Sequence, residues 1–140
     1  YGLVGSEMCI RDSYRIADMI RDQRDIKVIA VKDYITYPKA SGYKSYHMIV
    51  SIPVYLSDRT VDTKVEVQIR TVAMDFWASL EHKIHYKFEG DAPENIKNEL
   101  VECARMVSDL DARMLSLNEE ILAISKKREE EKQLNSGTSK

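Results

Sequence analysis

Several features that define common protein classes are missing from this sequence of 140 residues. The two cysteines, Cys9 and Cys103, form no CxxC pair, so neither a zinc ribbon nor a dithiol redox motif is expected. The histidines form no HExxH motif, which argues against a dedicated metallohydrolase. No apolar run approaches the ~20 residues of a membrane span, and the net charge is only −2. We therefore expect neither DNA nor a membrane as a partner, and a reducing, cytoplasmic location.

The composition that remains is that of one ordinary globular domain, with 44% hydrophobic and 31% charged residues. Residues 1–13 fit this domain poorly, because they show neither a helical nor a strand period. They also lack the charged and apolar regions of a signal peptide. We interpret them as foreign sequence, such as translated adaptor, or else as a frayed or disordered native N-terminus.

From Tyr14 onward the hydrophobic pattern predicts alternating types of secondary structure. The expected elements are a short helix ending near Asp25, a strand over 26–31, a loop over 33–45, strands over 46–55 and 63–70, and a helix from Thr71 to about Phe88. The short polar turn between the second and third strands favours an antiparallel hairpin. This order predicts an α+β fold in which helices flank a mixed or antiparallel sheet.

A long helix is predicted after Pro93 by apolar residues at alternating spacings of four and three, which is a heptad seam. The seam residues are Ile96, Leu100, Cys103, Val107, Leu110, Met114, Leu117, Ile121 and Ile124. Such a seam either packs on the domain or pairs with a partner helix. Thirty helical residues span roughly 45 Å, which exceeds a small domain and favours self-association. After Ser125 the chain is polar except for Leu134 and Gly137, and we expect residues 127–140 to be a disordered tail.

The loop before the second strand contains several groups suited to a nucleotide. Lys39 is a point charge for phosphate, Tyr43 follows a glycine and can stack on a base, and His47 can donate a hydrogen bond. A solvated basic surface loop is the alternative interpretation of the same residues.

The polar face of the third strand is a second candidate. Alternation places Glu66, Gln68 and Arg70 on one face of that strand. A carboxylate, an amide and a guanidinium in a row suit a metal, a sugar hydroxyl and a phosphate respectively. An ordinary solvent-facing strand surface is the alternative.

Three separated motifs occur together: KDYI-x-x-PK-x-SGY-x-S-x-H, then VEVQIRT, then MDFWASLEHK-x-x-YK. Together they resemble the synthetase domain of the RelA/SpoT superfamily, and most closely its small stand-alone alarmone synthetases, over about residues 14–124. The resemblance implies a nucleotidyltransferase-like domain that transfers the pyrophosphate of ATP to the 3′-hydroxyl of GTP or GDP with Mg²⁺, producing (p)ppGpp for the stringent response.

The resemblance also implies roles for individual residues. Tyr43 matches the tyrosine that stacks on guanine, and Lys39 and His47 match residues around the acceptor phosphates. Glu66 matches a glutamate that helps to hold Mg²⁺ and activates the 3′-hydroxyl as a base.

Three further positions are carried over from the family pattern. Gln68 and Arg70 share the face of that glutamate and are expected to contact the GTP or GDP. Ser41 stands where the wider superfamily often has asparagine, so a contact that needs the longer amide is in doubt.

The resemblance divides the chain into a partial synthetase domain over 14–90, an oligomerisation helix over 91–126 that implies a homotetramer, and the tail over 127–140. Basic residues and a second metal-binding aspartate that the family carries upstream have no counterpart in residues 1–13. We therefore expect an enzyme whose 140-residue chain is inactive by itself. A non-catalytic guanine-nucleotide-binding module and an oligomerising coiled-coil protein are the alternatives.

Overall fold

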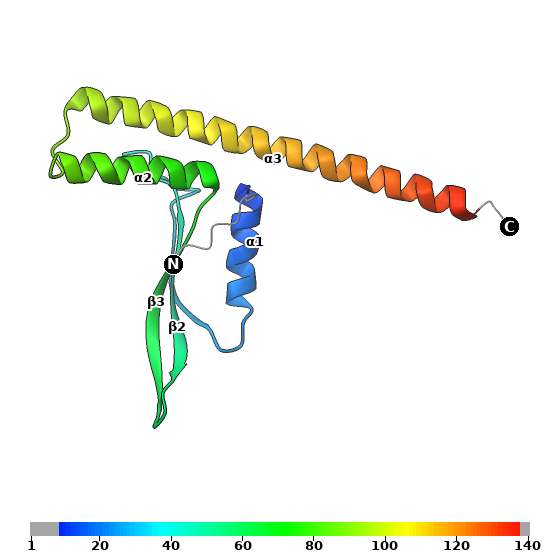
Figure 1. The fold of residues 1–140 in the computed structure, drawn as a ribbon, viewed down its shortest axis with the longest axis horizontal. Helices are drawn as coiled ribbons and strands as arrows, with labels where there is room; N and C mark the ends of the chain where they lie inside the picture. Colours follow the sequence, from blue (N-terminus) through cyan, green and yellow to red (C-terminus); the bar gives the residue numbers. More distant parts are fainter. Residues whose placement is uncertain (1–8, 138–140) are drawn as a thin grey trace.

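A computed structural model describes residues 9–137 of the chain. Its elements are α1 (Ile10–Arg21), β1 (Lys27–Asp33), β2 (Tyr46–Tyr55), β3 (Thr60–Ile69), α2 (Val72–Lys87) and α3 (Glu94–Gly137). The three strands form an antiparallel sheet in the order β1-β2-β3 (Figure 1). The predicted α+β class, the hairpin and the long C-terminal helix are confirmed.

The register of the sheet sorts the side chains onto two faces. β2 pairs with β3 from Tyr46 opposite Ile69 to Tyr55 opposite Thr60, without a shift along the hairpin. β1 pairs with β2 through a bulge between Val28 and Ala30. Because side chains alternate along a strand, even-numbered residues of β2 face one side and odd-numbered residues face the other.

The even-numbered side of β2 is the core face. Tyr46, Met48 and Val50 are buried there against Ala17 of α1 and Met74 of α2. Figure 1 shows α1 along this side of the sheet, while no described helix lies over the other side. The opposite face, which carries His47 and Glu66, is therefore open over the described part of the chain.

Helix α2 begins where β3 ends, and its start is fixed by a capping residue. Thr71 has extended backbone angles, and its side chain accepts a hydrogen bond from the backbone N–H of Met74 at 3.2 Å. A threonine at this position satisfies one of the free N–H groups of the first turn and contributes about 1 kcal/mol. The helix start predicted at Thr71 is confirmed, and the cap sets where the chain turns from sheet to helix.

Helix α3 runs antiparallel to α2 and then continues past the rest of the molecule (Figure 1). The start of the heptad seam packs on the domain, where Leu100 is buried and Val107 is partly buried. The later seam residues Leu110, Leu117 and Ile121 are 50%, 52% and 60% exposed. The first interpretation of the seam, packing on the domain, therefore holds for its beginning and does not account for its end.

The sequence-based boundaries at both ends of the chain need correction. α3 extends to Gly137, so the disordered tail predicted from residue 127 is wrong up to residue 137, and residues 138–140 lie outside the described part. Lys, Arg, Glu and Gln are strong helix formers, and a run made mostly of them continues a helix that is already nucleated.

At the N-terminal end, the hydrophobic pattern becomes clear only at Tyr14, but α1 begins four residues earlier, at Ile10. Cys9 and Ser13 are buried, so residues 9–13 are ordered rather than frayed. Residues 1–8 lie outside the described part, and the foreign origin of residues 1–13 stays a prediction.

Candidate functional site

The loop between β1 and β2 is held at both of its ends by hydrogen bonds. Asp33 accepts bonds from the backbone N–H groups of Ile35 and Thr36, both at 3.0 Å, and from the hydroxyl of Tyr14 at 2.8 Å. Burial raises the pKa of Asp33, but these donors outweigh it and hold that pKa below its usual value. The loop therefore leaves β1 in a fixed direction.

A tight turn at the far end of the loop presents Tyr43. The backbone N–H of Gly42 donates to the carbonyl of Lys39 at 2.9 Å, and the N–H of Lys39 donates to the carbonyl of Tyr43 at 3.1 Å. Gly42 has φ +94°, in the left-handed region where a side chain is strained. The glycine thus allows the turn that directs Tyr43 toward the open face of the sheet.

Five polar side chains on this face form a closed ring of polar contacts, four of which are hydrogen bonds. On one arm, Arg70 Nη2 donates to Tyr43 Oη at 2.7 Å, Tyr43 Oη lies 2.9 Å from His47 Nε2, and His47 Nδ1 lies 3.2 Å from Glu66 Oε1. On the other arm, Arg70 Nη2 donates to Gln68 Oε1 at 2.6 Å. Gln68 Nε2 then donates to Glu66 Oε1 at 3.1 Å. Both arms therefore lead from the guanidinium to the carboxylate.

One neutral tautomer of His47 fits the first arm. In this tautomer Nδ1 carries the proton and lies 3.2 Å from Glu66 Oε1, while Nε2 accepts the hydroxyl proton of Tyr43, whose oxygen accepts from Arg70. Burial lowers the pKa of His47, and the charges of Arg70 and nearby lysines act in the same direction against the opposing effect of Glu66. A neutral imidazole at neutral pH is therefore consistent with the geometry.

The ring of Tyr43 is surrounded by cations and aromatic groups. Lys39 Nζ lies 5.1 Å from its centroid, and the guanidinium carbon of Arg70 lies 5.3 Å away. Tyr34 and Trp77 lie edge-on or tilted at centroid distances of 6.1 and 6.5 Å. Such an electron-rich ring, flanked by positive groups, is suited to a planar base that carries phosphates.

The structure brings together all but one of the residues predicted for the site. Those that meet are Lys39, Tyr43, His47, Glu66, Gln68 and Arg70. Ser41 is exposed within the turn, and among the described residues no hydrogen bond joins its side chain to this group. The main contribution of the fold is to place the functional side chains of the loop next to those on the open face of β3.

Four residues of the same neighbourhood were not singled out from the sequence. Lys32 pairs in register with His47 and faces the same side, and Tyr34 packs edge-on against His47 at 5.2 Å. Asp75 accepts a hydrogen bond from Arg70 Nη1 at 3.1 Å, and Trp77 supports Tyr43 from behind. Alternation along β1 would have indicated Lys32, while the other three contacts depend on tertiary packing.

Glu66 is the one carboxylate in the ring, and its fit to a divalent cation can be judged by ligand chemistry. Among residues 9–137, no three His, Cys, Asp or Glu side chains gather as a ready-made metal cage. Mg²⁺ is commonly held by one or two carboxylates together with water and substrate phosphates. Glu66, 53% exposed at the open face, fits that mode of binding.

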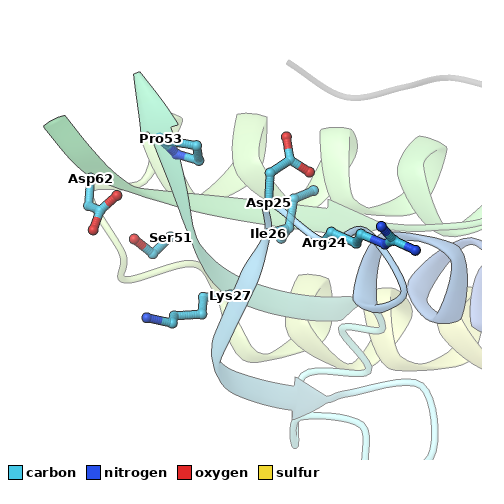
Figure 2. Close-up of a pocket in the computed structure, with 7 residues that line it drawn as sticks. All are labelled: Arg24, Asp25, Ile26, Lys27, Ser51, Pro53 and Asp62. Atoms are coloured by element: carbon cyan, nitrogen blue, oxygen red, sulfur yellow. The ribbon is translucent and has the colours of Figure 1, made fainter. Parts of the chain in front are cut away.

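A separate small pocket of about 140 Å³ lies on the same face toward the hairpin tip. Figure 2 shows the residues that line it, namely Arg24, Asp25, Ile26, Lys27, Ser51, Pro53 and Asp62. Ligand pockets for small molecules usually measure about 300–1,000 Å³. The charges of this pocket are mixed and its volume is small, so the ring around Tyr43 remains the stronger candidate.

No helix within residues 9–137 is both long and apolar enough to cross a bilayer.

Comparison with known proteins points to one family. A family model described as "Region found in RelA / SpoT proteins" matches residues 6–91. The chain is 46% identical to the GTP pyrophosphokinase YwaC of Bacillus subtilis over 112 residues, which is 80% of this chain and 53% of that protein. It is 37% identical to the GTP pyrophosphokinase YjbM of the same organism over 116 residues, or 81% of this chain and 55% of that protein.

Solved structures agree with this result. The crystal structure of small alarmone synthetase 2 from Bacillus subtilis superposes with a TM-score of 0.78 at 46% identity, covering 80% of this chain and 61% of that one. Small alarmone synthetase 1 from the same species, bound to its product pppGpp, gives 0.77 at 36% identity, covering 81% and 59%. The chain thus spans less than two-thirds of these proteins.

Proposed function

We propose, because this chain belongs to the RelA/SpoT family, that it forms the acceptor-nucleotide site of a GTP pyrophosphokinase that converts GTP or GDP into (p)ppGpp. The observation that carries the proposal is the ring of polar contacts that joins Tyr43 to Glu66 through His47. A base-stacking residue and a carboxylate held in one rigid group suit a substrate with a base at one end and a reacting hydroxyl near the other. The relatives named as GTP pyrophosphokinases support the same chemistry.

The reaction that we propose needs an oriented hydroxyl and neutralised phosphate charge rather than a covalent intermediate. The 3′-oxygen of the acceptor attacks the β-phosphorus of ATP, AMP leaves, and the hydroxyl proton passes to the Glu66 carboxylate as general base. Gln68 donates to Oε1 of that carboxylate at 3.1 Å, and His47 Nδ1 lies 3.2 Å from the same oxygen, which together fix its direction. One of its oxygens is thereby engaged by the protein, and the other is left for substrate.

Lys39 and Tyr43 would act in sequence as the nucleotide enters. In the free chain, the Lys39 ammonium lies near the rings of both Tyr34 and Tyr43, at 5.0 and 5.1 Å. Guanine stacking on Tyr43 displaces this exposed, flexible side chain. Its charge is then available to the acceptor phosphates, which a lysine binds as a point charge.

Mg²⁺ is the cofactor that we propose, with Glu66 and the substrate phosphates as its ligands. When bound, the ion would neutralise charge that develops on the transferred phosphates. Arg70 and Lys32 would supply the fixed positive charge on the same face of the sheet.

The test is calorimetric titration of GDP with Mg²⁺ into the chain and into two tyrosine variants. Tyr43→Ala should weaken binding by the value of one stacked base, about 1–3 kcal/mol. Tyr37→Ala is the matched control, because Tyr37 lies in the same loop but is 76% exposed. Equal affinities for the wild type and Tyr43→Ala would contradict the proposal, and so would equal weakening by both variants.

The non-catalytic binding module remains the second candidate, and Glu66→Gln separates it from the enzyme. The amide keeps the size and an oxygen that can lie beside His47, but it cannot accept a proton as a base. Our proposal predicts that GDP binding survives in Glu66→Gln while pyrophosphate transfer is lost. The assay uses a form of the protein that transfers pyrophosphate when Glu66 is present. Full transfer activity of the Glu66→Gln variant in that form would overturn the role given to Glu66.

We further propose that the outer part of α3 mediates self-association, with a homotetramer as the expected state, in the cytoplasm. Its support is the row of half-exposed seam residues Leu110, Met114, Leu117, Ile121 and Ile124. Apolar residues at heptad spacing are stabilised by pairing with another helix. Leu117→Glu with Ile121→Glu should yield monomers in light scattering, and an unchanged mass would contradict the proposal. This seam is also the feature that would favour the coiled-coil alternative if no nucleotide bound.

A further inference from the structure

The buried part of α3 contacts the candidate site from behind, on the side away from the open face. The indole N–H of Trp77 donates to the carbonyl of Leu100 at 2.9 Å. Tyr43 packs on the cluster that Trp77 forms with Leu100 and Ala104. One turn of α3 thus lies directly behind the aromatic ring that is proposed to stack on guanine.

The first precise contact joins Ala104 to the turn before Tyr43. A Cβ atom placed on Gly42 would overlap the Cβ of Ala104, and it would lie 3.6 Å from Trp77. Ala104 is buried, so the turn is seated on the helix with no room for another methyl group. The position of α3 therefore determines where Gly42, and with it Tyr43, can lie.

The second precise contact joins Asp111 to the residue after Arg70. The hydroxyl of Thr71 donates to Asp111 Oδ2 at 2.8 Å while its oxygen accepts the N–H of Met74. Thr71 is 1% exposed and Asp111 is 4% exposed. A buried carboxylate whose bond reaches the cap of α2 fixes the junction from which Arg70 projects.

The two contacts converge on one hydrogen bond of the site. Tyr43 and Arg70 are bonded to each other at 2.7 Å although 27 residues separate them. Each is the immediate chain neighbour of a residue that α3 holds, Gly42 in one case and Thr71 in the other. We propose that Ala104 and Asp111 are positioning residues for the acceptor nucleotide, so that the seating of α3 sets guanine-nucleotide affinity. This inference rests on the function proposed above.

The experiment combines GDP titration with Mg²⁺ and the intrinsic fluorescence of Trp77, which is the only tryptophan in the chain. Asp111→Ala should weaken GDP binding about tenfold and Thr71→Val by at least as much, because Thr71→Val removes the bond to Asp111 and also the cap of α2. The double variant should be no weaker than Thr71→Val, because the bond between Thr71 and Asp111 is already lost in that variant. Asp111→Asn keeps an acceptor oxygen for Thr71 and should restore affinity to within about twofold. Asp109→Ala is the matched control, since Asp109 lies exposed on the same helix.

A purely structural role for Asp111 predicts a different pattern. Stability would fall, but the folded protein, identified by unchanged Trp77 emission, would bind GDP as the wild type does, and that result overturns the proposal. If Asp111→Ala does not fold, the Ala104→Gly variant tests the proposal instead. It removes the methyl group on which Gly42 packs and leaves no buried polar group without a partner. We expect affinity to fall about threefold in Ala104→Gly and to stay unchanged in Ala112→Gly, which has the same helix-propensity cost at an exposed position. Equal affinities in these two variants would refute the inference.

The failure of the inference and the failure of the proposed function are distinguishable. A wild-type chain that binds no GDP overturns the nucleotide site itself, and the positioning proposal with it. A wild-type chain that binds GDP, together with folded Asp111 and Ala104 variants that bind equally well, overturns only the positioning role.

Discussion

The two ends of the open sheet face carry similar residues but differ in what surrounds them. Near the β1–β2 loop, Glu66 and Gln68 belong to the ring of polar contacts that includes Tyr43. Toward the hairpin tip, Asp62 and Lys64 continue the same face of β3, yet neither forms an ion pair with another described residue. The strand alone therefore does not make a site.

What distinguishes the loop end is the convergence of other elements on it. The loop brings Tyr43, the start of α2 brings Asp75, and the buried part of α3 packs behind Tyr43 and accepts a hydrogen bond from Thr71 at the start of α2. The tip end has only the opposing strand and the pocket of Figure 2, whose lining charges are mixed. A polar strand face becomes a candidate site where tertiary packing fixes the partners of its side chains.

The largest effect that we expect from this difference is on stability, through the packing of the core beneath the two ends of the sheet face. Met48 and Val54 lie on the core face of β2, and Met48 is fully buried while Val54 is partly exposed. Met48→Ala should lower the free energy of unfolding by about 2–5 kcal/mol, because it leaves a cavity. Val54→Ala should cost less than about 1 kcal/mol. Urea unfolding measures both, and equal costs would mean that the two ends are equally well packed.

The strands and the long helix on which this comparison rests were predicted well from the sequence. Strict alternation indicates the polar face of β3, and the bounds predicted for the second strand, 46–55, match β2. The heptad seam indicates the long helix, although the polar run after residue 126, which suggests disorder, is helical to Gly137. Periodicity reports local conformation, and it identifies the apolar face without naming what covers that face.

The contacts that make the site were beyond local reasoning. The bond from Arg70 to Tyr43 and the bond from Thr71 to Asp111 join residues 27 and 40 positions apart. Nothing in the spacing of Ala104 or Asp111 marks them, since one is a small seam neighbour and the other is one acid among many. Such pairs are fixed only when the helices have packed.

A smaller effect is expected from acid, and it tests whether His47 is part of the ring. Burial holds the pKa of His47 below its usual value of about 6.5. A depressed pKa means that the folded state favours the neutral ring, so this contribution to stability is present above 6.5 and is lost as the pH falls through the folded pKa. The advantage of the wild type over His47→Gln should therefore shrink on acidification, as measured by urea unfolding at several pH values.

The same prediction has a control at each end of the sheet face. Glu66 is the neighbour that raises the pKa of His47, so Glu66→Gln should lower that pKa further in an NMR titration of the imidazole. Asp62→Asn removes a carboxylate from the same face of β3 and should leave it unchanged. A pKa that moves with Asp62 but not with Glu66 would contradict the ring.

The smallest expected effect compares an ion pair at each end. Arg70 and Asp75 are 3.1 Å apart with side chains 22% and 51% exposed, whereas Arg59 and Asp58 at the hairpin tip are 3.1 Å apart and both 66% exposed. Exposed pairs contribute about 0–1 kcal/mol, because water screens them and the side chains lose freedom. Asp58→Ala should therefore change the free energy of unfolding by less than about 0.5 kcal/mol. Asp75→Ala should cost about 1 kcal/mol, since Asp75 also lies in the first turn of α2, where the helix dipole favours an acid. Thermal unfolding at low and high salt measures both changes, and a larger cost at Asp58 than at Asp75 would reverse the order of the two ends.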